Sequence, residues 1–155
     1  MDKLLIVDLN SLITAASAAT AYKLEKELAG SHSVILADSV ELPSVLLKDK
    51  KFIKIPEASS FSFSHQLLGI CLDLGVDRVF PLRKAEITAL AESRQLFDEY
   101  GIKVMVPLPH QVASFFGSSK TGEVLIKEED DDFAGRGVYL INEGSLDDLQ
   151  LLTAD

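Results

Sequence analysis

Short apolar runs alternate with segments of helical period along this chain, and residues 74–107 show the alternation most clearly. A short apolar run over residues 78–82 is bounded by a turn, which is typical of a strand buried on both faces. Apolar residues then recur at helical spacing until Gly101, and residues 102–106 form another apolar run. The pattern predicts a helix over residues 84–100 between two parallel strands, with the right-handed crossover that such units adopt.

Three earlier apolar runs extend this unit into a sheet. Strands are predicted at residues 3–8, 33–37 and 52–55, and an alanine-rich helix is predicted between the first two, from Ser11 to Gly30. Parallel strands joined by helices need cover on both faces. The predicted fold is therefore α/β, a Rossmann-like three-layer sandwich with a five-stranded parallel sheet. We expect the first strand at its centre and the two strands that flank the 84–100 helix on one side of it.

The pattern changes after Pro107. A connection leads to two apolar runs at hairpin spacing, residues 124–127 and 138–141, and Ser145 is a candidate cap for a last short helix. A length of 155 residues favours one domain. We therefore predict a Rossmann-type region over residues 1–107, with the connection, β-hairpin and helix of residues 108–155 packed on it.

Composition and charge narrow the class of protein. Hydrophobic residues make up 47% and charged residues 25%, as in ordinary globular proteins. The net charge of -9 argues against nucleic acid as a partner, because phosphate-backbone binding needs clustered Lys and Arg. The apolar run before Asp8 is too short for a signal peptide or a membrane span, so we expect a cytoplasmic protein with no membrane partner.

The sequence lacks the motifs of dinucleotide binding, of cysteine or histidine catalysis and of metal binding. The turn after the first predicted strand has no G-x-G-x-x-G, which argues against a dinucleotide site. Cys71 lies in an apolar helical pattern, as a buried structural thiol does, and His65 near a helix start is expected to be solvated. No His, Cys and Asp spacing indicates a metal. We predict no catalytic residue and no metal ligand.

A ligand crevice is predicted where polar residues follow the strands. In open α/β sheets, ligands bind outside the carboxyl ends of the strands. The candidate residues there are Asp8, Asn10, Asp38, Arg83 and Glu86. Asp8 could instead cap the following helix, and Arg83 and Glu86 could bind a ligand or pair with each other.

Residues 75–107, GVDRVFPLRKAEITALAESRQLFDEYGIKVMVP, resemble the pre-ATP-grasp domain of ATP-grasp ligases, especially carbamoyl-phosphate-synthase-like ones, and the order of elements agrees over residues 3–107. The segment VLIKEEDDDFAGRGVYLINEGSLDDL looks like the ATP-grasp strand-loop-strand. The resemblance implies ATP with Mg as cofactor, with Lys127 on the phosphates and Gly135, Arg136 and Gly137 in the closing loop.

The chain also departs from the ligase pattern. ATP-grasp enzymes carry another subdomain between these two pieces and a larger one after them, with the acidic and Asn ligands for magnesium. The acidic run of residues 128–132 would repel a triphosphate unless a cation bridged it. Such a run is usually a solvated loop, and a metal site is the alternative.

Three hypotheses follow. The first is a non-catalytic or accessory ATP-grasp-related domain that binds a small ligand or a protein partner, such as an ATP-grasp subunit or a second copy of itself. The second is a split subunit or fragment of an ATP-dependent carboxylate-amine ligase. The third is a Rossmann-like domain whose hairpin covers a sheet edge. We expect the chain alone to hydrolyse no ATP and to bind it weakly or not at all, because it lacks a rigid carboxylate pair for magnesium.

Overall fold

The computed structural model describes residues 9–47, 51–119, 121–141 and 149–155. The parallel sheet contains β1 (Leu9–Ile13), β2 (His32–Asp38), β3 (Lys51–Lys54), β4 (Arg78–Phe80) and β5 (Lys103–Val104). The helices are α1 (Ala19–Leu28), α2 (Ser44–Leu47), α3 (Phe63–Leu74), α4 (Lys84–Glu92), α5 (Arg94–Glu99) and α6 (Pro109–Val112), with a 3-10 turn at Ala113–Phe115. A second sheet contains β6 (Glu123–Lys127), β7 (Gly137–Ile141) and β8 (Leu149–Leu151).

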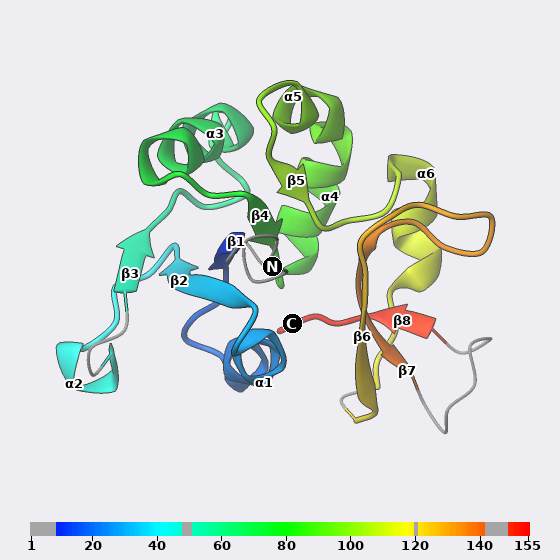
Figure 1. The fold of residues 1–155 in the computed structure, drawn as a ribbon, viewed down its shortest axis with the longest axis horizontal. Helices are drawn as coiled ribbons and strands as arrows, with labels where there is room; N and C mark the ends of the chain where they lie inside the picture. Colours follow the sequence, from blue (N-terminus) through cyan, green and yellow to red (C-terminus); the bar gives the residue numbers. More distant parts are fainter. Residues whose placement is uncertain (1–8, 48–50, 120, 142–148) are drawn as a thin grey trace, which may run out of the picture.

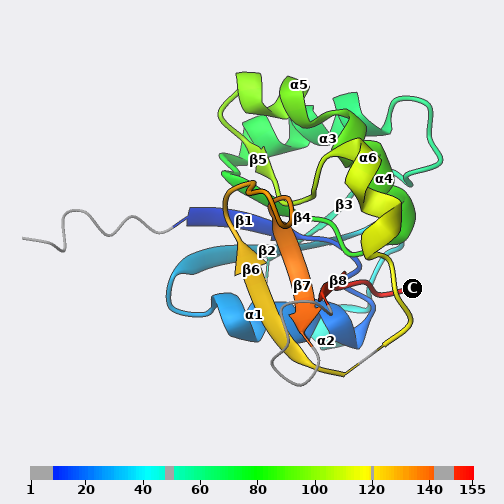
Figure 2. The same cartoon turned by 90° about the vertical axis from the view of Figure 1, so that its right-hand side faces the viewer.

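The five strands of the first sheet are all parallel and lie in the order β3-β2-β1-β4-β5. Helices α3, α4 and α5 lie on one face of this sheet and α1 on the other (Figures 1 and 2). The predicted α/β class is therefore confirmed. The first described strand, β1, is central, and the strands that flank the 84–100 segment, β4 and β5, lie to one side of it as predicted.

The first described strand is not the predicted one. Strand β1 covers Leu9–Ile13, where the prediction has a turn and the start of a helix, and the predicted strand at residues 3–8 lies outside the described residues. Within β1, Leu12 packs into the core on the α3 side and Ile13 into the core on the α1 side. Alternation of this kind belongs to a strand covered on both faces. The helix therefore begins only at Ala19.

Two predicted helices also differ from the structure. The helix predicted over residues 84–100 is divided at Ser93 into α4 and α5. The last helix was predicted from Ser145, which lies outside the described residues, but Leu149–Leu151 form β8 and pair antiparallel with β7. Leu151 is buried in that sheet and packs with Tyr139 of β7. The C-terminal segment is therefore a third strand where the prediction had a helix.

The antiparallel sheet shares its core with the parallel one. Strands β6 and β7 pair as the predicted hairpin. Tyr139 belongs to the same buried cluster as Leu12 and Val104, whereas Val138 belongs to the cluster of Ile13. Since the two faces of β7 pack into different clusters, the hairpin is held against the body of the fold on both sides. Within the described residues, no helix has the length and apolar character needed to cross a membrane.

Candidate functional site

Polar side chains from three strands meet at one end of the parallel sheet. Asp38 is the last residue of β2, Thr14 directly follows β1, and Arg83 lies between β4 and the start of α4. Glu86 occupies the first turn of α4. Because parallel strands end at the same edge of a sheet, these residues come together although they are far apart in sequence.

Asp38 anchors the first half of the site. A nitrogen of the Arg83 guanidinium donates to both carboxylate oxygens of Asp38, at 2.9 and 3.1 Å. The hydroxyl and N–H of Ser17 and the N–H of Ser39 donate to the same carboxylate. Burial alone would raise the pKa of Asp38, but these donors together lower it. Asp38 is therefore a buried anion that neutralises Arg83.

Glu86 forms the second half. The Thr14 hydroxyl accepts the N–H of Leu82 at 2.8 Å and donates to Glu86 Oε1 at 2.6 Å. The Arg83 N–H lies 3.4 Å from the same oxygen. Glu86 is only 1% exposed, and burial raises its pKa against the opposing hydrogen bond from Thr14. Thr14 therefore fixes the position of a carboxyl group that is poorly hydrated.

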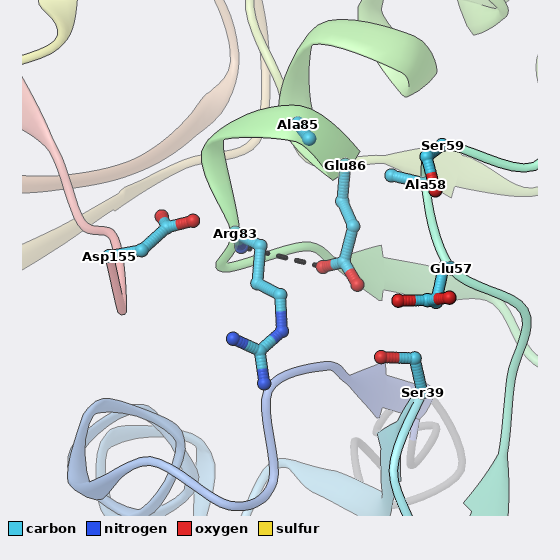
Figure 3. Close-up of a pocket in the computed structure, with 8 residues that line it drawn as sticks. All are labelled: Ser39, Glu57, Ala58, Ser59, Arg83, Ala85, Glu86 and Asp155. Atoms are coloured by element: carbon cyan, nitrogen blue, oxygen red, sulfur yellow. Dashed lines mark hydrogen bonds between the residues drawn. The ribbon is translucent and has the colours of Figure 1, made fainter.

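A hollow of about 190 Å³ opens between these groups. It is lined by Ser39, Glu57, Ala58, Ser59, Arg83, Ala85, Glu86 and Asp155. Figure 3 shows the Glu86 carboxylate directed toward the space between Glu57 and Ser39. The chain segment before Asp155 reaches this place because the N–H of Ala154 donates to the carbonyl of Leu82 at 2.6 Å. The hollow thus combines three carboxyl groups, two hydroxyls and one guanidinium.

Three of the five predicted crevice residues meet here. Asp38 contributes through its pair with Arg83, and both Arg83 and Glu86 line the hollow. Asn10 was expected at this end of the sheet but lies near the start of β1, where its amide donates to the carbonyl of Gly75 at 2.9 Å. The cause is the shifted first strand. Asp8 lies outside the described residues.

Sequence reasoning missed several groups of the site. Thr14 and Ser17 fell inside a predicted helix, although they follow β1 in the structure. The correct position of β1 would have placed Thr14 at the carboxyl end of a central strand, which is the signal that identified Asp38. Glu57 and Ser59 lie in the irregular segment after β3, and no local pattern distinguishes them.

The predicted phosphate contacts of the hairpin have other partners. Lys127 ends β6 opposite Gly137 of β7, and its ammonium group pairs with Asp131. Arg136 is buried, and its side chain donates to the carbonyl of Val104 at 3.0 Å. A methyl group added at Gly135 would lie 2.7 Å from the backbone of Pro107, so this glycine permits close packing inside the fold.

The ATP-grasp resemblance implies a magnesium nucleotide bound by the basic residues of the hairpin. The cations that would meet its phosphates are engaged by carboxylates or backbone of the same chain. Across the described ranges, no group of three or more His, Cys, Asp or Glu side chains is placed to hold a metal ion. The hairpin residues as arranged here do not fit a magnesium nucleotide. Separately, Cys71 is buried, and burial raises its pKa to about 12.

Comparison with known proteins identifies the family. Residues 12–105 match the model of the PylC-like N-terminal domain. The match covers more than half of the chain, and the chain therefore belongs to this family of pre-ATP-grasp-type domains. The predicted resemblance over the Rossmann-type region is confirmed at this level. Residues after 105, which include the hairpin, lie outside the match.

No curated protein matches the chain. Among solved structures, a short chain dehydrogenase family protein from Francisella tularensis subsp. tularensis SCHU S4 is similar, with 17% identity and a TM-score of 0.41. The alignment covers 66% of this chain and 49% of that protein, so the chain spans about half of the dehydrogenase's length.

Proposed function

We propose that the chain is an accessory, non-catalytic domain of the ATP-grasp-related class that binds a small ligand carrying a positively charged amine. Membership in the PylC-like N-terminal family supports the class. The observation that supports the ligand class is the hollow at the carboxyl ends of the strands, whose lining is rich in carboxyl groups.

The charges of the hollow favour a cation. Glu57, Glu86 and Asp155 face it with carboxyl groups, and Arg83 is the one basic residue among the described lining residues. The positive charge of Arg83 is already offset by Asp38, which receives two contacts from the guanidinium. The balance is therefore negative, and an ammonium group would gain Coulomb energy together with hydrogen bonds to carboxylate and hydroxyl oxygens.

The size of the hollow favours a small group. Its volume of about 190 Å³ lies below the range of roughly 300–1,000 Å³ that is common for small-molecule pockets. A whole nucleotide exceeds this space, whereas the amine end of a small molecule fits it. Ser39 and Ser59 add hydroxyls that can orient such a group.

Amide chemical shifts of the isotope-labelled chain test this proposal. We expect 1,4-diaminobutane to shift the signals of Ser39, Ala58 and Ala85, and succinate to leave them in place. Glu57→Gln should weaken the diamine's affinity about two- to fivefold, as expected for an exposed charge at the rim of the hollow, whereas Glu92→Gln, the same change at an exposed position of α4 outside the hollow, should not. Equal shifts with succinate, or shifts scattered over the surface, would exclude the proposed ligand class.

The ligase hypothesis remains as the second candidate. It is favoured by the pairing of β6 with β7, which places Lys127 opposite Gly137 as in a strand-loop-strand. We expect no phosphate release from ATP above background. A nucleotide that binds the folded chain would raise the unfolding midpoint, and we expect no such rise with magnesium ATP. Steady phosphate release that is lost in Lys127→Ala but kept in Lys26→Ala, a change at an exposed position of α1, would support the ligase instead.

A further inference from the structure

The acidic run after β6 lies against basic side chains of the parallel sheet and its helix cover. Glu128 pairs with Arg78 of β4 at 3.0 Å, and Glu129 pairs with Lys103 of β5 at 2.7 Å. Asp130 pairs with the guanidinium of residue 94 in α5 at 2.6 Å. Three successive carboxylates thus reach three different elements, so the loop is attached at several points.

Arg136 closes the same loop from its other end. Strand β5 is the edge of the parallel sheet, so one row of its backbone groups has no neighbouring strand to pair with in that sheet. The guanidinium of Arg136 donates to the carbonyl of Val104 in β5 and to Asp98 of α5, each at 3.0 Å. The N–H of Arg136 donates to Asp130 at 2.9 Å, which joins the two ends of the loop.

We propose that residues 128–136 form an electrostatic clasp that closes the β5 edge and holds the antiparallel sheet against the parallel one. Lys127 belongs to the base of this clasp through its pair with Asp131. The clasp gives the acidic run a role inside the fold, independent of the ligand proposed for the hollow. It can open, because its anchoring carboxylates are partly exposed and dissolved ions weaken such pairs.

The ion pair between Arg94 and Asp130 should contribute only modestly to the stability of the closed clasp. Nη1 of Arg94 is buried and, among the described residues, has no hydrogen-bond partner. An unsatisfied buried donor reduces what the pair with Asp130 contributes. The clasp is therefore held by the sum of several contacts, and loss of one of them should raise the open population without unfolding the sheet.

Exchange of the Arg136 Nε–H with water reports on this opening, because that proton lies between the guanidinium and the Val104 carbonyl. We expect exchange to become about three- to tenfold faster in Asp130→Asn, which removes the charge that faces Arg94. The matched control is Asp132→Asn, the same change at an exposed position of the loop. It should leave the rate unchanged, because Asp132 makes no ion pair with the described residues.

A salt titration of the unmodified chain tests the clasp without any substitution. Raising sodium chloride from about 50 mM to about 500 mM should speed the Arg136 Nε–H exchange, because the Debye length shrinks over this range. The amide protons of the central strand β1 should exchange at the same rate throughout. Equal effects of the two variants, or an exchange rate indifferent to salt, would show that the loop does not act as a clasp.

Discussion

Thr14→Val tests the best-defined contact of the site. The two side chains have nearly the same shape, so the substitution removes a hydroxyl and little else. That hydroxyl is fully buried, accepts the N–H of Leu82 and donates to Glu86 Oε1. Valine leaves one backbone donor without its partner and deprives a buried carboxyl group of a close donor. A hydrogen bond to a charged group contributes about 1.5–3 kcal/mol and an unsatisfied buried donor costs about 1–3 kcal/mol. Both effects arise from one hydroxyl and do not add in full, so we expect a loss of about 2–4 kcal/mol.

Urea denaturation measures this loss as a lower midpoint at constant slope. The unfolding temperature should fall by roughly 5–15 °C, at about 2–4 °C per kcal/mol for a chain of this size. Thr88→Val is the matched control, since its exposed hydroxyl bonds only within α4, and we expect a change within about 0.5 kcal/mol. Thr14→Ser keeps the hydroxyl and should be destabilised far less than the valine variant. If Thr14→Val and Thr88→Val cost the same, the buried bridge contributes nothing and the reasoning fails.

Two further predictions concern charge and packing. Burial raises the pKa of Glu86 above 4.5, so the folded chain holds the carboxyl proton of Glu86 more tightly than the unfolded chain does. The contribution of Glu86 to stability is therefore lost as pH rises through the folded pKa. The unfolding free energy of the unmodified chain, relative to Glu86→Gln, should therefore decline as pH rises from 4.5, and a constant difference would contradict this. Gly135→Ala should cost about 1–3 kcal/mol, because the added methyl would lie 2.7 Å from the Pro107 backbone. Gly69→Ala in α3, where nothing lies within 4 Å, should instead stabilise by about 0.5–1 kcal/mol, and equal effects would refute the packing argument.

The sheet could be predicted because its signals are local. Apolar runs with turns at their ends mark β2 to β5, and residues 32–38 and 51–54 fall within one residue of the predicted strands. Strand β1 was missed because Asn10 and Ser11 interrupt its apolar pattern. Ser11 is nevertheless buried and shares a hydrogen bond with His32, a residue of the neighbouring strand. A polar residue that is satisfied by a distant partner leaves no trace in hydrophobic periodicity.

The site was predictable only where its residues directly follow correctly placed strands. Asp38 and Arg83 met this condition. Because the first strand was predicted at residues 3–8 and not at Leu9–Ile13, Asn10 was expected at the wrong end of the sheet and Thr14 was not recognised as following a strand. The partners of the acidic run were beyond reach for another reason. Glu128 and Asp130 pair with residues 50 and 36 positions earlier in the chain, and only the folded topology brings them together.

The two charged regions occupy opposite ends of the parallel sheet, which makes them separable. Arg78 and Lys103 begin β4 and β5 and hold the clasp there, whereas Asp38 and Arg83 lie beyond the carboxyl ends of β2 and β4. Asp38 is fully buried and receives donors from several backbone and side-chain groups, so added salt should reach it far less than the partly exposed pairs of the clasp. Opening of the clasp would therefore leave the hollow's contacts in place. A chain whose clasp is loosened by Asp130→Asn can be assayed for amine binding at low salt, where the carboxyl groups of the hollow are not screened, and the failure of either proposal would not decide the other.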